Sequence, residues 1–194
     1  EENGSGVSGW EDMSGNSNDF AQATASAQPS LDPAAQGGRP GLLFDGGDDE
    51  MHGSSIVGML SDSDQWTVFV VGGGWTWGTN VNLYYGRGML GAPDGGSSYF
   101  EVSVTSEAGN GLGMAYYDYV AHRQAFGDDS QAEGDPFVLA GVCEGTDWIV
   151  RVNGVEGSTV TTSAGLRSQA TTLELGRGNN NLAAWDGNIC EVLI

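Results

Sequence analysis

Acidic residues gather in two neighbouring stretches of the chain, and carboxylates so close together are candidate metal ligands. Asp45, Asp48 and Asp49 surround a pair of glycines, and Asp62 and Asp64 follow a short distance further on. Ca²⁺ takes about six to eight oxygen ligands from loops of this kind. Asp side chains in a glycine turn also accept hydrogen bonds from the amides of that turn. The sequence therefore leaves two interpretations of Asp45 to Asp49 open. They form a calcium site, or their side chains accept hydrogen bonds from the amides of their own turn.

Two aromatic clusters have the residue types that sugar-binding proteins use. A pyranose stacks its apolar C–H face on an aromatic ring and offers hydroxyls to nearby polar side chains. The candidates are Trp75 and Trp77 in the first cluster, and Tyr117, Tyr119, His122 and Arg123 in the second. Three glycines precede Trp75, which favours a protruding loop. Packing in the core or between subunits is the alternative interpretation of both clusters.

Other catalytic or metal-binding patterns are missing from the sequence. His52 and His122 have no neighbours in a metal-binding spacing, and there is no G-x-S-x-G motif. Cys143 and Cys190 lie in separate apolar segments, and we expect them to be buried free thiols, with a disulfide between them as the alternative. No cofactor is required by any motif, which leaves Ca²⁺ as the one candidate.

The charge balance excludes several classes of partner. The 194 residues include 26 acidic residues and six arginines but no lysine, so the net charge is −20. Nucleic acid and anionic membranes are poor partners for such a chain. Its apolar runs are far shorter than the roughly 20 residues of a membrane helix, and no targeting segment is visible at its start. We expect neither nucleic-acid binding nor membrane insertion.

Short apolar segments between glycine-rich turns predict a β protein. Glycine occurs 33 times, well above its usual share of about 7 %. Val, Thr, Tyr, Phe and Trp concentrate in the segments that we expect to be strands, namely 41–45, 65–72, 80–85, 99–106, 111–117, 136–143, 148–153, 158–162, 171–176 and 188–194. The polar residues 1–41 carry few apolar anchors.

The pattern within the strands is typical of antiparallel sheets. Residues 100–105 alternate between apolar and polar, which predicts one face in a core and one in water. Asn153 and Gly154 supply the two positive-φ positions of a type I′ turn and predict a hairpin. No segment shows a sustained helical period with caps. We therefore predict an all-β fold, a two-sheet antiparallel β-sandwich or jelly roll.

Several segments, in this order and spacing, resemble the laminin-G-like or concanavalin A-like lectin and glucanase domains, in the form found in bacterial surface proteins and phage structural proteins. The segments are Val7 to Thr24 with its W-x-D-x-S-G-N pattern, Arg39 to Asp49 with F-D-G-x-D-D, Trp66 to Val71, Trp148 to Gly154, and Leu173 to Ile194 with L-x-L-G and W-x-G-x-I-x-E-V-x-I. The resemblance implies a sandwich of about twelve to fourteen strands in a single domain, 1–194, that includes residues 1–41.

The family that the chain resembles contains glucanases, so their catalytic motif can be looked for in this sequence. Their retaining mechanism needs two carboxylates about 5 Å apart, which the family places in a Glu-x-Asp-x-(x)-Glu strand. The Glu-x-Asp of this chain is Glu133 to Asp135, and Phe137 and Val138 occupy the positions of the second Glu. We therefore expect no enzymatic activity. The Trp residues of the recurrent segments, Trp10, Trp66, Trp148 and Trp185, are interpreted as packing residues.

Two functions from different classes remain. The first is a non-catalytic, surface-exposed binding or decoration module, with a phage capsid or tail protein or an adhesin as the main example and cell-surface glycans as ligands. Its partners would be other structural proteins of an assembly in which the chain is oligomeric. The alternative is a carbohydrate-binding accessory domain, or a degenerate glucanase, of a secreted polysaccharide-degrading system. Both predict an extracellular or virion-surface location.

The net charge adds an environmental expectation. One face of each sheet is needed for the core, so the acids must crowd the outer faces and loops. Their mutual repulsion is tolerable where salt screens it or cations bind. The sequence therefore predicts a saline or marine setting, and a loss of stability when salt and divalent cations are removed.

Overall fold

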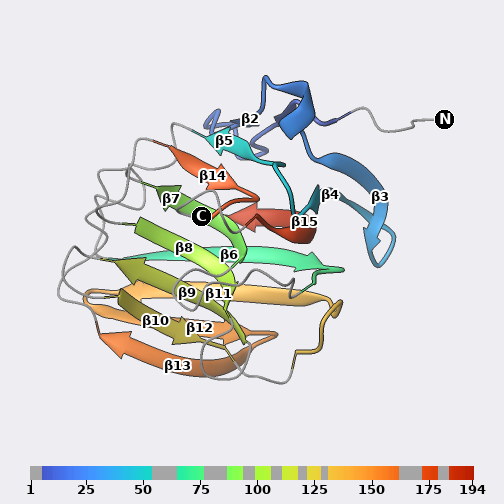
Figure 1. The fold of residues 1–194 in the computed structure, drawn as a ribbon. Coiled ribbons are helices and arrows are strands. Elements are labelled where there is room, and N and C mark those ends of the chain that lie inside the picture. The colour runs from blue at the N-terminus through green and yellow to red at the C-terminus, as the bar shows by residue number, and fades with distance from the viewer. Residues whose placement is uncertain are drawn as a thin grey trace.

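Two antiparallel sheets make up the fold, and Figure 1 shows one lying in front of the other. The computed structural model describes residues 6–53, 65–76, 87–93, 99–105, 111–117, 122–127, 131–161, 172–178 and 184–194. The eight-stranded sheet has the order β1 (Gly9–Trp10), β2 (Phe20–Ala21), β5 (Met51–Gly53), β14 (Leu173–Leu175), β7 (Arg87–Pro93), β8 (Tyr99–Thr105), β9 (Gly111–Tyr117) and β10 (His122–Phe126). The seven-stranded sheet has the order β13 (Val155–Thr161), β12 (Asp147–Val152), β11 (Phe137–Glu144), β6 (Gln65–Gly73), β15 (Asp186–Leu193), β4 (Arg39–Asp45) and β3 (Ser30–Gln36).

The core lies between the sheets and follows from the period of two along each strand. In β6, Trp66, Val68 and Val70 are buried while the residues between them are less so. The neighbouring strand β11 alternates in the same way, and its Leu139 pairs with Val70. Directly opposed residues of antiparallel strands share a face. These residues form one core cluster with buried residues of the eight-stranded sheet such as Met114, so the apolar faces of the two sheets meet and the predicted all-β sandwich is confirmed.

The tryptophans of the inner faces pack as the sequence predicts. Trp66 and Trp148 make an edge-to-face pair with ring centroids 5.2 Å apart. Trp185 is fully buried and packs edge-on against Phe137 at 6.1 Å. Such edge-to-face geometry suits the quadrupoles of aromatic rings. Trp10 differs from these three, because it is only half-buried.

The hairpin predicted at residues 153–154 is present. Val152 of β12 pairs with Val155 of β13, and the turn between them has φ of 51° at Asn153 and 82° at Gly154. Asn and Gly tolerate this left-handed region better than other residues. Asn153 also binds back to the sheet, because its Oδ1 accepts the Val138 N–H at 2.8 Å. This side chain therefore closes the hairpin and holds the start of β11.

The polar N-terminal part adds strands to both sheets. β1 and β2 extend the eight-stranded sheet beyond β5, and β3 pairs with β4 at the edge of the other sheet. Backbone hydrogen bonds such as Val7 N–H to the Pro29 carbonyl, at 2.7 Å, tie the segment together. A 3₁₀ turn at Ala25–Ala27 is the helical element of the described residues.

Two further observations concern the cysteines and membrane insertion. Both cysteines are free thiols, as predicted, and the expected burial is confirmed for Cys143 but not for Cys190, which is half-buried. Burial, followed by the charges of Asp32 and Glu191, raises the pKa of the Cys190 thiol, so it stays protonated at neutral pH. Within the part of the chain that the structure describes, no helix has the length and apolar character to cross a membrane.

Candidate functional site

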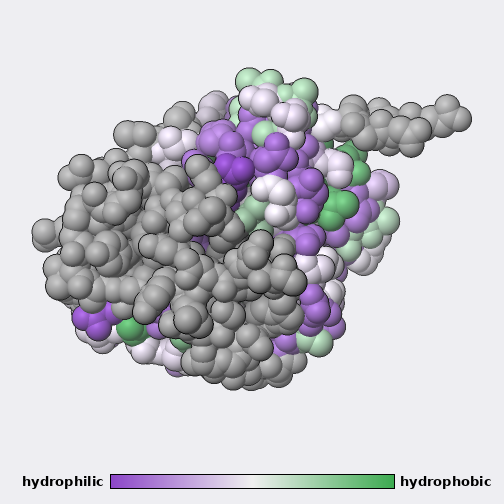
Figure 2. All heavy atoms as spheres, viewed as in Figure 1, coloured by the Kyte–Doolittle hydropathy of each residue, from purple (hydrophilic) through white to green (hydrophobic). Residues whose placement is uncertain are grey.

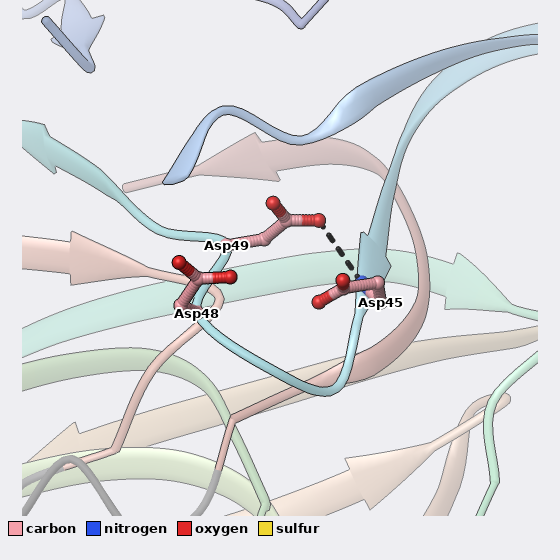
Figure 3. Close-up of side chains that lie close together, drawn as sticks. All are labelled: Asp45, Asp48 and Asp49. Carbon is pink, nitrogen blue, oxygen red and sulfur yellow. Dashed lines mark hydrogen bonds between the residues drawn. The ribbon is translucent and has the colours of Figure 1, made fainter. Parts of the chain in front are cut away.

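The acidic turn between β4 and β5 brings three carboxylates together. One oxygen each from Asp45, Asp48 and Asp49 lies within 4.8 Å of the others, and Figure 3 shows the three side chains around the turn. With Ca²⁺–oxygen distances of about 2.4 Å, two ligands on opposite sides of the ion are about 4.8 Å apart. The spacing therefore fits a cation. Asp62 and Asp64, the other two candidate ligands, lie outside the described residues.

The same turn also caps itself. The Gly47 N–H donates to Asp45 Oδ1 at 2.8 Å, and the Asp45 N–H donates to Asp49 Oδ2 at 3.1 Å. The pKa of Asp49 is raised to about 6, mainly by burial and also by the charges of Asp45 and Asp48, while the hydrogen bond from the Asp45 N–H opposes the shift. Both interpretations from the sequence are thus compatible with the geometry. Capping uses one oxygen each of Asp45 and Asp49.

A chain of charged side chains continues from this turn onto the outer face of the eight-stranded sheet. Arg177 Nη1 lies 3.0 Å from Glu50 Oε2. His52 lies between two glutamates, with Nε2 3.3 Å from Glu50 Oε1 and Nδ1 3.7 Å from Glu174 Oε1. Burial raises the pKa of Glu174, and His52 opposes that shift. Figure 2 shows hydrophilic residues gathered in this region, near β5 and β14.

One row of opposed residues crosses the whole eight-stranded sheet on its outer face. From edge to edge the row is Gly9, Ala21, His52, Glu174, Gly91, Glu101, Ala115 and Gln124. Glu174 and Glu101 are separated by one strand, which places their Cα atoms about 10 Å apart. His52 and Glu174 are direct neighbours in the row, and Gly91 separates Glu174 from Glu101.

The backbone of residues 176–178 covers part of this row. A Cβ added at Gly178 would lie 2.5 Å from Glu101 Oε2, and Glu101 is fully buried. The Gly176 N–H donates to the Met89 carbonyl at 2.9 Å, which holds this segment against β7. Glu101 is therefore shielded, and the open part of the row lies towards His52 and Glu174.

Trp75, the first predicted sugar platform, is packed inside the protein. Its side chain is 1 % exposed, and its indole N–H donates to the Asp135 carbonyl at 3.1 Å. The chain turns inward at Gly74, whose φ is 61°, and Gly187 leaves room for the ring because a Cβ there would meet Trp75 at 2.7 Å. The prediction of a protruding Trp75 is therefore wrong, and the alternative interpretation of Trp75, packing in the core, is confirmed. Trp77 lies outside the described residues.

The second aromatic cluster is described in part. Tyr117 pairs with His122 and with Tyr99 in backbone register, two positions along β9 from Ala115 of the polar row. Nothing is described of the Tyr117 and His122 side chains, and Tyr119 lies outside the described residues. Arg123 is exposed near the start of the edge strand β10. The role of this cluster stays a prediction.

The Glu-x-Asp sequence lies in a turn and not on a strand. Glu133 and Asp135 precede β11 and are exposed, and Asp135 Oδ2 accepts the Ala132 N–H at 3.1 Å. Phe137 is in the core, and Val138 is on the outer face of the seven-stranded sheet. These residues therefore do not present paired carboxylates on a strand.

A groove that the sequence did not predict lies between the β1–β2 loop and the end of β15. It has a volume of about 610 Å³, within the usual range for small-molecule sites. Trp10, Phe20 and Val192 contribute apolar surface, Asn16 contributes a polar group from the β1–β2 loop, and Glu191 contributes one from β15. Trp10 was interpreted as a packing residue. The groove combines residues from the two ends of the chain, so no local signal in the sequence could have shown it.

Comparisons with known proteins find likeness in structure but not in sequence. No protein-family profile and no curated protein matches the chain. Domain 4 of AbnA, a GH43 extracellular arabinanase from Geobacillus stearothermophilus solved in complex with arabinotriose, superposes with a TM-score of 0.70 at 14% identity, over 94% of this chain and 84% of that one.

Two further solved structures share the architecture. The CBM40 of the Ruminococcus gnavus IT-sialidase gives a TM-score of 0.56 at 14% identity, over 79% of this chain and 88% of that one. A GH54 α-L-arabinofuranosidase gives 0.59 at 14% identity, over 96% of this chain but 46% of its own. The fold is that of carbohydrate-binding and glycosidase β-sandwich domains. This agrees with the expected concanavalin-like architecture, and nothing in it supports a phage-specific form.

Proposed function

We propose that the chain is a non-catalytic carbohydrate-binding module. The observation that carries this proposal is the likeness to AbnA domain 4, which extends over nearly the whole of both chains. CBM40 is a second neighbour of similar size, and it has also been solved with α2,3-sialyllactose. Because fold alone does not fix function, the residues of this chain must supply the rest of the argument.

The absence of catalysis is part of the proposal and rests on the carboxylates. Hydrolysis by either stereochemical route needs two carboxyl groups that flank the scissile bond. Among the described residues, Glu174 and Glu101 share the outer row, but Gly178 lies against Glu101. Glu133 and Asp135 lie in an exposed turn. We therefore propose binding without bond cleavage, as an accessory module of an extracellular polysaccharide-acting system. No observation favours the virion role over this one.

A glycan array followed by calorimetry tests the proposal. We expect the chain to bind a restricted set of plant or microbial oligosaccharides with micromolar Kd, which corresponds to about −8 kcal/mol, and to release no reducing sugar from them. The control for catalysis is a long incubation of each bound oligosaccharide with the protein, followed by chromatography. If no glycan binds while the protein joins a larger particle, the virion hypothesis replaces this one.

A further inference from the structure

We propose that the groove between the β1–β2 loop and β15 is the saccharide-binding site of this module, and that it selects neutral sugars over anionic ones. The inference rests on the proposed function and names the site and the ligand class. Its starting point is shape, because ligand sites are concave and combine apolar surface with a few polar groups. This groove, of about 610 Å³, has both.

The floor of the groove supplies a stacking surface. Trp10 is half-buried and packs against the core on one side while it lines the groove on the other. Phe20, which is directly opposed to Trp10 on β2, and Val192 of β15 line the same groove. A ring that is fixed from behind loses little side-chain entropy when a ligand binds. Trp10 can therefore present an apolar face to the C–H face of a sugar.

One wall is a polar loop held together by hydrogen bonds to Asp12. The Asp12 carboxylate accepts the Ser14 N–H at 2.7 Å, the Ser14 hydroxyl at 2.7 Å and the Asn18 N–H at 3.0 Å. These hydrogen bonds, the Ser14 side chain first, lower the pKa of Asp12. The loop is closed by the Asp12 N–H, which donates to Asp19 at 2.7 Å. The wall is thus organised before any ligand arrives.

The charge of the lining residues decides the class of ligand. Glu11, Asp12 and Glu191 are acidic, Asn16 and Asn18 are neutral amides, and none of the described residues that line the groove is basic. Carboxylate and amide oxygens accept hydrogen bonds from sugar hydroxyls, while a sugar carboxylate would meet like charge. The groove therefore suits a neutral oligosaccharide and rejects sialic and uronic acids.

The test combines an affinity measurement with a site-specific signal. The probes are arabinotriose, a neutral oligosaccharide, together with the best binder from the array, and 3′-sialyllactose as the anionic sugar. The variants are Trp10→Ala, Trp10→Phe, Asn16→Ala and Glu191→Ala, with Leu43→Ala as a matched exposed control outside the groove. The Trp10 indole N–H resonance, assigned from the spectrum of the Trp10→Phe variant, reports on the site directly.

We expect Trp10→Ala to weaken neutral-sugar binding at least about tenfold and the two wall variants about two- to tenfold each. Trp10→Phe should retain part of the affinity, Leu43→Ala should match the parent, and the Trp10 resonance should shift on titration. Asn16 and Glu191 are exposed, so their variants keep the test valid if Trp10→Ala does not fold.

Four outcomes overturn the inference in distinguishable ways. If a neutral sugar binds but none of the groove variants changes its Kd, the groove is not the site and the proposed function stands. If 3′-sialyllactose binds more tightly than every neutral sugar and shifts Trp10, the ligand class is wrong. If groove variants change the oligomeric state measured by light scattering and leave sugar affinity unchanged, a second copy of the chain is the occupant. If no sugar binds the parent protein, the proposed function fails first.

Discussion

His52 of β5 and Glu174 of β14 are directly opposed in the eight-stranded sheet, with Nδ1 of the imidazole 3.7 Å from Oε1 of the carboxylate. The other imidazole nitrogen faces Glu50 at 3.3 Å. One imidazole therefore lies between two carboxylates on a protein with a net charge of −20. The interaction with His52 lowers the free-energy cost of keeping the Glu174 carboxylate charged at a partly desolvated position.

We expect Glu174→Gln to stabilise the protein at neutral pH. Burial raises the pKa of Glu174, so in the range above its ordinary value of 4.5 the folded state holds this proton more tightly than the unfolded state. Stability from this group is present at low pH and is lost as pH rises through the folded pKa. The variant should match the parent near pH 4 and melt a few degrees higher at pH 7.5.

Differential scanning calorimetry between pH 4 and pH 8 measures this difference. Glu156→Gln is the control. Glu156 is an exposed glutamate that pairs with Arg151 on the seven-stranded sheet, whereas Glu174 lies on the eight-stranded sheet. A Tm difference that stays constant over the whole range, or a variant that is less stable at pH 7.5 than at pH 4 relative to the parent, would contradict the burial argument.

The acidic turn gives the second prediction, in which calcium and pH act together. Asp49 has a folded pKa of about 6 against an ordinary value of 3.8, so in the absence of metal its contribution to stability falls as pH rises from about 4 to 6. A cation bound by Asp45, Asp48 and Asp49 offsets this loss. Millimolar Ca²⁺ should therefore raise the Tm by about 2–4 °C at pH 7.5 and by much less at pH 5.

Asp48→Asn separates the calcium site from the turn. Asp45 and Asp49 accept the hydrogen bonds of the turn, whereas Asp48 is exposed and adds charge. The variant should keep the parent Tm in chelator and lose the Ca²⁺ response, and Glu144→Gln should keep both. A parent protein whose Tm ignores Ca²⁺ at pH 7.5 would leave the self-capped turn as the sole role of the cluster.

Salt dependence is the third prediction and follows from net charge. With 26 acidic residues and six arginines, repulsion among carboxylates destabilises the folded state unless ions screen it. Raising NaCl from about 10 mM to about 500 mM in the presence of chelator should raise the Tm by several degrees, since the Debye length falls from about 30 Å to a few ångström. An unchanged Tm would show that the acids are spaced far enough apart to tolerate one another.

The strands that the sequence predicted best are those with a strong two-residue period. β6, β11 and β12 each alternate between core and surface. Because core-facing positions favour apolar residues, this alternation is visible in the sequence. The strand Ser30–Gln36 was missed because its residues are largely polar or small and it lies at a sheet edge. Its backbone pairing with β4 forms without apolar side chains in alternation. Pairing of this kind leaves little trace in the sequence.

The candidate site divides in the same way between local and distant contacts. The acidic turn was predictable because Asp45, Asp48 and Asp49 are close in sequence, and Asp45 and Asp49 accept hydrogen bonds from amides of the same turn. The burial of Trp75 was not, since it depends on the space at Gly187 of a distant strand. The groove likewise depends on Trp10 and Val192, from opposite ends of the chain. Contacts of this range follow from topology and not from any motif.

The hairpin turn between β12 and β13 gives the last prediction. Asn153 has a positive φ of 51°, its Oδ1 accepts the Val138 N–H at 2.8 Å, and its Nδ2 donates to Gln131 Oε1 at 3.1 Å. Asn153→Ala loses both hydrogen bonds and forces alanine into the left-handed region. The free energy of unfolding should therefore fall by about 2–3 kcal/mol. Asn153→Gly loses the hydrogen bonds but keeps the favourable backbone, and it should cost about 1–2 kcal/mol. Urea unfolding of the two variants measures each part, and equal losses would mean that backbone strain contributes nothing at this turn.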